Sequence, residues 1–189
     1  MMYRTLLMLL LCALPARAQI AVSANDATEI LVDGVRVMVP NAPPDTVTLI
    51  DLGVRPPQVL AELPAPSSWS GPPQMIAVTP DEAIALLSNS LKVNPADPTK
   101  TIQDNKISVI DLKASPPAII ATLDAGLFPN GIAINAAGTL ALVTNRGDST
   151  VSIYTIAGTR VVSAGSISLQ DRACAPSMPA FTQTAPWCT

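Results

Sequence analysis

Short aliphatic runs separated by turn residues follow one another along most of the chain. In the clearest stretch, Val, Ile and Leu often alternate with polar residues over 131–135, 139–144, 150–156 and 160–167. Gly, Pro, Asp and Asn separate these runs, as they commonly separate antiparallel strands. The pattern predicts four β-strands in this stretch, and no helical period competes with it beyond the N-terminal segment.

The same pattern occurs three times. Residues 138–145 and 151–156 align without a gap with residues 34–41 and 47–52. The middle copy is formed by two further segments, 83–89 and 107–112. A fixed period predicts repeated structural units that pack on one another.

The repeats predict an all-β fold. Four strands in about 44 residues fit one blade of a β-propeller, so we expect a partial propeller of about three four-stranded antiparallel blades. The blades would occupy residues 19–68, 69–125 and 126–169. In the first of them, Asp33-Gly34 is expected to form a hairpin turn, because glycine tolerates the positive φ that a tight turn needs.

Three blades make an incomplete ring. Propellers close with about four to eight blades, and seven would need roughly 300 residues. The uncovered end faces are expected to carry Ile30, Val32 and Val37 at one end, with Ile153 and Val161 at the other. Because exposed strand edges and apolar faces favour association, we expect the chain either to self-associate or to lack blades that complete it.

The middle copy differs from the others by an inserted loop at 92–103. Lys92, Asp97, Lys100 and Asp104 lie in or beside this loop. Loops on a rigid scaffold are frequent binding sites, so these four residues are candidates to face a ligand. Their mixed charges are equally typical of a solvent-exposed loop that binds nothing, and both interpretations stay open.

Three asparagines end equivalent strands in the alignment. Asn41, Asn89 and Asn145 could line one face of the ring, or each could cap its own turn. Asp148 follows in the turn after Asn145. Asn89, Asn145 and Asp148 therefore join the ligand-facing candidates, with turn formation as the alternative.

Part of the third copy resembles a known repeat. Residues 141–153 read Ala-Leu-Val-Thr-Asn-Arg-Gly-Asp-Ser-Thr-Val-Ser-Ile and follow Pro-Asn-Gly-Ile-Ala-Ile at 129–134. This is similar to the repeat of the YVTN-type bacterial β-propellers, with Leu142 where the family has tyrosine. Residues 85–89 are a weaker copy. The resemblance covers roughly residues 22–169 and implies a truncated or fragmentary propeller of that family.

The first 18 residues have the pattern of a secretory signal peptide. A positively charged start, an apolar run and small residues before Ala18 predict cleavage between Ala18 and Gln19. The alternative, a membrane anchor, needs roughly twenty apolar residues, and the run is shorter. We therefore expect a periplasmic or secreted protein with no membrane span in the mature chain. Cys174 and Cys188 would then form either a disulfide or two unpaired thiols.

Composition excludes several classes of function. The 189 residues include no His, which removes Ser-His-Asp and Cys-His nucleophile pairs and His-ligated metal sites. A net charge of −3 offers no positive field for a polyanion, so nucleic acid is not an expected partner. The sequence thus presents no candidate catalytic, cofactor-binding or metal-binding residues, and no cofactor is expected.

Three functions remain in view. The leading expectation is an exported, non-catalytic YVTN-type propeller that acts as a binding or scaffold module for an unknown ligand or protein. The second is a fragment of a propeller enzyme of the lactone-hydrolase type, which the family resemblance allows. The third is a non-functional truncated gene product. It is prompted by the irregular tail at 170–189, where the repeat stops and a frameshift would account for the change.

Overall fold

The computed structural model describes residues 19–67, 75–169 and 175–182. Ala18, Cys174 and Cys188, and with them the predicted signal peptide and disulfide, lie outside the described residues. All regular elements within the described ranges are β-strands, thirteen in total, and none is a helix. The all-β expectation is therefore confirmed for the part of the chain that the structure describes.

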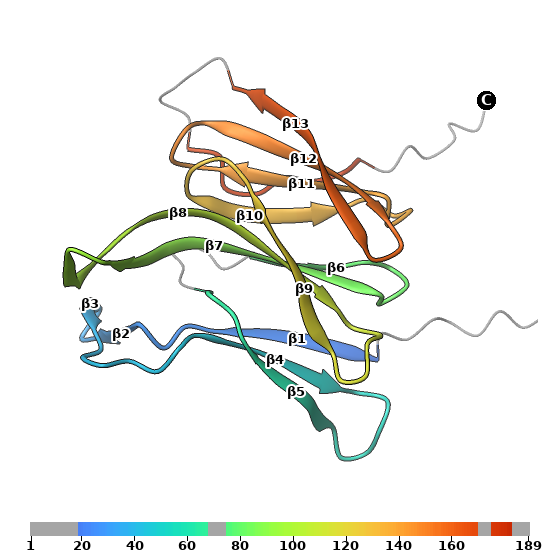
Figure 1. The fold of residues 1–189 in the computed structure, drawn as a ribbon, viewed down its shortest axis with the longest axis horizontal. Coiled ribbons are helices and arrows are strands. Elements are labelled where there is room, and N and C mark those ends of the chain that lie inside the picture. Colours follow the sequence, from blue (N-terminus) through green and yellow to red (C-terminus); the bar gives the residue numbers. More distant parts are fainter. Residues whose placement is uncertain (1–18, 68–74, 170–174, 183–189) are drawn as a thin grey trace, which may run out of the picture.

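The strands form three antiparallel sheets that stack face to face (Figure 1). The first sheet contains β1 (Ile20–Asn25), β4 (Thr46–Asp51) and β5 (Gln58–Pro64). The second contains β6 (Ile76–Val78), β7 (Ile84–Asn94), β8 (Asp97–Asp111) and β9 (Ala118–Asp124). The third contains β10 (Pro129–Ile134), β11 (Leu140–Asn145), β12 (Thr150–Ala157) and β13 (Arg160–Ser168). A separate hairpin joins β2 (Glu29–Val32) to β3 (Val35–Met38).

The second sheet contributes to two hydrophobic cores, one on each of its faces. Successive side chains of a strand point to opposite faces, so neighbouring leucines on β7 enter different cores. Leu86 joins the cluster shared with the third sheet, which includes Tyr154. Leu87 joins the cluster shared with the first sheet, which includes Val47 and Leu49. The near-continuous aliphatic run of β7 is explained by burial on both faces.

The first sheet differs from the prediction, because it has three strands instead of four. The sequence alignment placed residues 34–41 beside 47–52, but β1 is the neighbour of β4, with Asn25 opposite Thr46. Val35–Met38 pairs instead with Glu29–Val32 in the separate hairpin. The physical reason is local: Asp33 and Gly34 both have positive φ, 50° and 80°, and close a tight turn that pairs its own flanking residues.

The expected inserted loop at 92–103 is a pair of extended strands. β7 and β8 run past the rest of their sheet and pair with each other there, with Leu91 opposite Gln103 and Lys92 opposite Ile102. We call this two-stranded extension, residues 90–103, the arm. It reaches the β2–β3 hairpin, where the Thr101 hydroxyl is 3.4 Å from a Glu29 carboxylate oxygen (Figure 1). The arm and the hairpin together form one end of the molecule.

Both outer faces of the stack combine polar groups with exposed apolar side chains, and on the first sheet Val59, which pairs with Ile50, is 64% exposed. On the first sheet, Asn25 Nδ2 donates to the hydroxyls of Thr46 and Thr48, and Ser23 donates to Asn25 Oδ1, so this outer face satisfies its own polar groups. On the third sheet, Ile167 is 56% exposed. The prediction that Val161 lies uncovered is wrong, because it is buried in the core between the second and third sheets.

The apolar residues predicted for the uncovered face of the first blade lie in a different part of the fold. Ile30, Val32 and Val37 are exposed, but they belong to the β2–β3 hairpin and not to the face of the first sheet. Ile30 pairs with Val37, and Val32 pairs with Val35, so these four side chains share one face of the hairpin. The exposed apolar residues therefore lie on a projecting ribbon.

Candidate functional site

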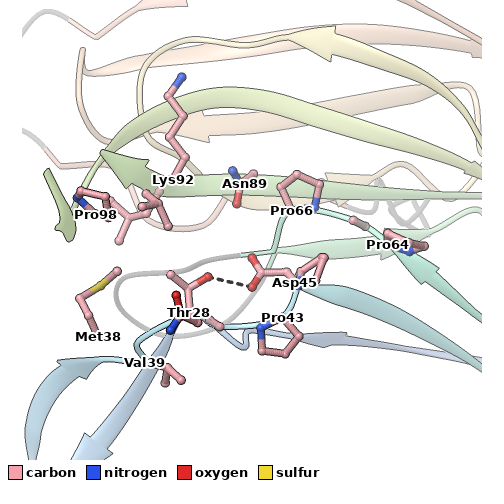
Figure 2. Close-up of a pocket in the computed structure, with 16 residues that line it drawn as sticks. Thr28, Met38, Val39, Pro43, Asp45, Pro64, Pro66, Asn89, Lys92 and Pro98 are labelled. Carbon is pink, nitrogen blue, oxygen red and sulfur yellow. Dashed lines mark hydrogen bonds between the residues drawn. The ribbon is translucent and has the colours of Figure 1, made fainter. Parts of the chain in front are cut away.

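A groove of about 560 Å³ opens between the arm and the first sheet (Figure 2). One wall is formed by β7 beyond the point where β1 ends. The opposite wall is formed by Thr28, Met38 and the connection from β3 to β4. The groove is thus the continuation of the core between the first two sheets, at the place where the first sheet has no further strand to fill it.

The β7 wall follows directly from strand alternation. Ala85 and Leu87 point into the core shared with the first sheet, so Asn89, Leu91 and Val93 continue on the same face. Burial decreases along this row: Asn89 is 2% exposed, Leu91 8% and Val93 40%. A row that begins in a closed core therefore ends as the open wall of a groove.

The opposite wall is held by the Asp45 carboxylate. Its Oδ1 accepts hydrogen bonds from the Ala27 backbone N–H and the Thr28 hydroxyl, both at 3.0 Å (Figure 2). Its Oδ2 accepts from the Ser67 backbone N–H, also at 3.0 Å. One side chain thus joins the end of β1, the start of β4 and the segment after β5, which fixes the shape of this wall.

Proline supplies much of the remaining lining. Prolines come from three separate segments, at positions 43, 44, 64, 66 and 98. Proline has a fixed φ and no backbone N–H, so such a wall is stiff and offers few hydrogen-bond donors. Together with Leu91, Val93 and Met38, these residues make the groove largely apolar.

Asn89, Lys92 and Asp104 form a hydrogen-bonded group in the β7 wall. Asn89 Nδ2 donates to Asp104 Oδ2 at 2.8 Å, and Lys92 Nζ donates to Asp104 Oδ1 at 3.0 Å. Burial by itself raises the pKa of Asp104, but the hydrogen bonds from Asn89 and Lys92 outweigh burial and hold that pKa below its usual 3.8. Asp104 is therefore ionised at neutral pH and acts as the fixed acceptor of this group.

The Lys92 ammonium group does not face the groove. Figure 2 shows the side chain leaving the strand on the side away from the Asp45 wall. Its stem lines the groove, while its charge is taken up by the ion pair with Asp104. Lys92, a candidate ligand contact from sequence, thus contributes to the structure of the wall.

The structure brings together only some of the sequence-predicted residues. Asn89 and Lys92 line the groove, and Asp104 lies behind them. Asp97 and Lys100 form an ion pair with each other, 2.8 Å from Nζ to Oδ2, at the tip of the arm. Both residues belong to the turn region and do not line the groove.

Asn145 and Asp148 lie in the third sheet, apart from the groove. Asn145 Nδ2 donates to the hydroxyls of Thr150 and Ser152 at 2.8 and 2.9 Å. Asp148 accepts from the Thr150 hydroxyl and from the Leu127 backbone N–H. Both side chains hold the turn between β11 and β12 against neighbouring segments.

The sequence analysis missed Asp45, the proline lining and one of the three equivalent asparagines. Asn25, at the end of β1, and not Asn41, is equivalent to Asn89 within β7 and to Asn145 at the end of β11. The available signal was the similarity of residues 20–25 to residues 84–89 and 140–145. Asn41, with a positive φ of 54°, instead lies in the connection from β3 to β4 and lines the groove.

The described residues contain no group of three or more His, Cys, Asp or Glu side chains arranged to hold a metal ion. Within the same ranges, we find no helix of the length and apolarity required to traverse a bilayer.

Comparisons with known proteins identify no family. No protein-family model matches the chain, and no curated protein matches it. A solved structure from Bacteroides fragilis NCTC 9343, described as a "putative 6-phosphogluconolactonase", aligns with a TM-score of 0.49 and 14% identity, over 67% of this chain and 34% of that protein. A functionally unknown protein from Desulfotomaculum acetoxidans DSM 771 aligns with a TM-score of 0.33 and 13% identity, over 78% of this chain and 52% of that one. The chain spans about a third and about half of these proteins, and both likenesses are too remote to assign a family or an activity.

Proposed function

We propose that this chain is an exported, non-catalytic binding module built as part of a YVTN-type β-propeller. The proposal is supported by three meandering sheets that stack on one another and by asparagines at equivalent positions of β1, β7 and β11, namely Asn25, Asn89 and Asn145. In this interpretation each sheet is one blade. Export through cleavage between Ala18 and Gln19 is part of the proposal, and N-terminal sequencing of the secreted protein is the check.

The observation that carries the binding function is the groove between the arm and the first sheet. Its volume of about 560 Å³ lies in the range of small-ligand sites, which bury apolar surface and use a few polar groups for orientation. Both walls are held in place, one by strand pairing in β7 and β8 and the other by Asp45. A preformed groove loses little entropy when it binds, because few of its groups need ordering.

Blocking the groove is expected to abolish binding. In the variant Val93→Arg, a long charged side chain would enter the open end of the groove, where Val93 is 40% exposed and can be changed without opening a core. We expect a ligand-detected NMR screen of chemically diverse fragments to find binders whose affinity falls at least about tenfold in this variant. Ile120→Arg, at a comparably exposed position on β9, is the control and should bind normally.

The screen can also contradict the proposal. If no fragment distinguishes Val93→Arg from Ile120→Arg, the groove does not bind small ligands. The lactone-hydrolase alternative has its own check, which is the rate at which the purified chain hydrolyses 6-phosphogluconolactone. Hydrolysis above the buffer rate that is lost on changing carboxylates would replace the binding function with an enzymatic one.

We also propose that the chain self-associates, or that further blades complete it, through the outer face of the third sheet. Ile167 and Val162 are exposed there, and the outer face of the first sheet exposes Val59 beside a group of hydrogen-bonded polar side chains. The double variant Val162→Lys with Ile167→Lys should shift the protein to a smaller species in sedimentation velocity, because charges at an apolar contact oppose association. Val59→Lys, on exposed β5, is the matched control. A wild-type protein that is already a single monomer and unfolds cooperatively would contradict self-association.

A further inference from the structure

The Asn89 side chain carries a hydrogen-bond acceptor without a partner. Its Nδ2 donates to the Asp104 carboxylate, and an ionised carboxylate only accepts hydrogen bonds, so the amide orientation is determined. Oδ1 must therefore point the other way, and Figure 2 shows it on the groove side of the β7 wall. Oδ1 is buried and has no hydrogen-bond partner among the described residues.

The two equivalent asparagines, Asn25 and Asn145, do not line the groove. Asn25 Oδ1 accepts from the Ser23 hydroxyl, so its amide is used on both sides. Asn145 Nδ2 donates to the hydroxyls of Thr150 and Ser152, and its Oδ1, like that of Asn89, is buried without a partner among the described residues, but Asn145 lies in the third sheet, apart from the groove. Only Asn89, of these three, has an acceptor that the protein itself fixes toward a groove. A buried acceptor left unmatched costs free energy, and a ligand that donates a hydrogen bond removes that cost.

The charges around the groove disfavour an anionic ligand. Asp45 and Lys92 are the charged residues in the described part of the lining, and the Lys92 ammonium group leaves the wall on the far side to pair with Asp104. The Asp45 carboxylate remains on the opposite wall. A phosphate or carboxylate would meet an acidic side chain and no inward-facing cation, so the site suits a neutral ligand.

The apolar walls of the groove further restrict the class of ligand that it can bind. Leu91, Val93 and Met38 are aliphatic or thioether side chains, the prolines are compact rings, and no Phe, Tyr or Trp is among the described residues that line the groove. Bases are commonly held by stacking on aromatic side chains, and sugar rings need several hydrogen bonds, whereas the described part of the lining has no aromatic ring and few hydrogen-bond donors. Aliphatic groups, in contrast, are matched by these walls through burial alone.

We propose that the groove binds an extended, uncharged polypeptide segment with aliphatic side chains, one of whose backbone N–H groups donates to Asn89 Oδ1. This inference rests on the proposed binding function of the same groove. An extended chain presents N–H groups at regular intervals with side chains on both sides, which fits a groove bounded by a β-strand on one wall and by proline-rich segments on the other. The aliphatic side chains of the segment then pack against Leu91, Val93 and the prolines.

The test uses the full chain and blocked synthetic peptides. The probe is acetyl-Ala-Val-Val-Ala-amide, with acetyl-Ala-Glu-Val-Ala-amide and 6-phosphogluconate as anionic probes and a cello-oligosaccharide as a sugar probe. We expect the neutral peptide to bind in titrations followed by NMR, and the other three to bind at least about tenfold more weakly.

Two variants at equivalent positions separate binding from stability. Asn89→Ala should weaken binding of the neutral peptide about tenfold, since one hydrogen bond to a desolvated acceptor is lost. Asn145→Ala removes the equivalent buried asparagine of the third sheet and should leave the affinity unchanged. Val93→Arg should abolish binding, and because that site is partly exposed, it keeps the test decisive if Asn89→Ala does not fold.

The outcomes distinguish the two proposals. If an anionic or sugar probe binds more tightly than the neutral peptide and is blocked by Val93→Arg, the groove is a binding site but the ligand class is wrong. If the neutral peptide binds and Asn89→Ala has no effect, the role of Asn89 is wrong. If no probe is sensitive to Val93→Arg, both the ligand class and the proposed function of the groove are overturned.

Discussion

Replacing Tyr154 by alanine is expected to lower the free energy of unfolding by about 4 kcal/mol. Tyr154 is fully buried in the core between the second and third sheets, and its hydroxyl donates to the Asp124 backbone oxygen at 2.6 Å. Truncation leaves a large cavity and an unpaired carbonyl. Because domains of this size are stable by only about 5–15 kcal/mol, urea unfolding should show a large shift of the midpoint.

Tyr154→Phe separates packing from the hydrogen bond. It keeps the ring and should cost only about 1 kcal/mol at neutral pH. Burial, with a smaller contribution from the charge of Asp124, raises the pKa of Tyr154 to about 12. A phenol whose folded pKa is raised stabilises the fold below its unfolded pKa, near 10, and this stabilisation is lost as the pH rises through 12.

The wild-type protein should therefore lose stability between pH 10 and 12 faster than Tyr154→Phe does. Urea unfolding at neutral and alkaline pH measures this difference. If both proteins lose the same amount of stability at alkaline pH, the Tyr154 hydroxyl is not buried as the structure has it. A small effect of Tyr154→Ala at neutral pH would contradict the packing of the third sheet on the second.

Replacing Asp104 by alanine is expected to lower the free energy of unfolding by about 2–3 kcal/mol at neutral pH. The change removes the acceptor of Asn89 Nδ2 and of the half-exposed Lys92 ammonium group. The folded pKa of Asp104 lies below its usual 3.8, so its contribution is present above the unfolded pKa and is lost as the pH falls through the folded pKa. The difference between wild type and Asp104→Ala should thus be largest at neutral pH and shrink below about pH 4.

Chemical unfolding of both proteins at neutral and acidic pH tests this dependence. Asp97→Ala, at the exposed tip of the arm, is the control and should change stability much less. An unchanged stability of Asp104→Ala would mean that Asn89 and Lys92 find other partners. In that case the fixed orientation of Asn89 would also be lost, and the peptide-binding inference with it.

The contribution of Asp26 to the free energy of unfolding should change with pH in the opposite direction to that of Asp104. Burial is the largest cause of its raised pKa, the charges of Asp45 and Glu29 add to it, and the backbone N–H groups of Thr28 and Glu29 lower it in part. A carboxyl whose folded pKa is raised favours the folded state as the pH falls through that pKa. Asp26 therefore partly offsets the acid sensitivity that Asp104 introduces.

The strands of the second and third sheets were predictable because their signals are local. Alternation and turn residues marked β10 to β13, and burial on both faces left an aliphatic run in β7. The first sheet was misassigned for an equally local reason. Two aliphatic segments, 20–25 and 35–38, resemble the strand expected beside β4. In the structure the first of them pairs with β4, while the Asp33-Gly34 turn pairs the second with β2.

The candidate site was only partly predictable. Asn89 stood out at the predicted end of a repeated strand and Lys92 in the predicted inserted loop, but the groove depends on what faces them. Asp45 and most of the prolines that line the groove are far from Asn89 in sequence. Their positions depend on the pairing of β1 with β4 and on the stacking of the first sheet on the second.

Periodicity and turn chemistry were therefore sufficient for the all-β class and for most strand positions, because each depends on residues that are close in sequence. Three features came only from the packing of segments distant in sequence: which strand joins the first sheet, the extension of β7 and β8 as an arm, and the opening of a groove beside Asn89. Hydrogen-bond partners across a sheet and the facing walls of a groove are set by three-dimensional contacts, and no local pattern encodes them.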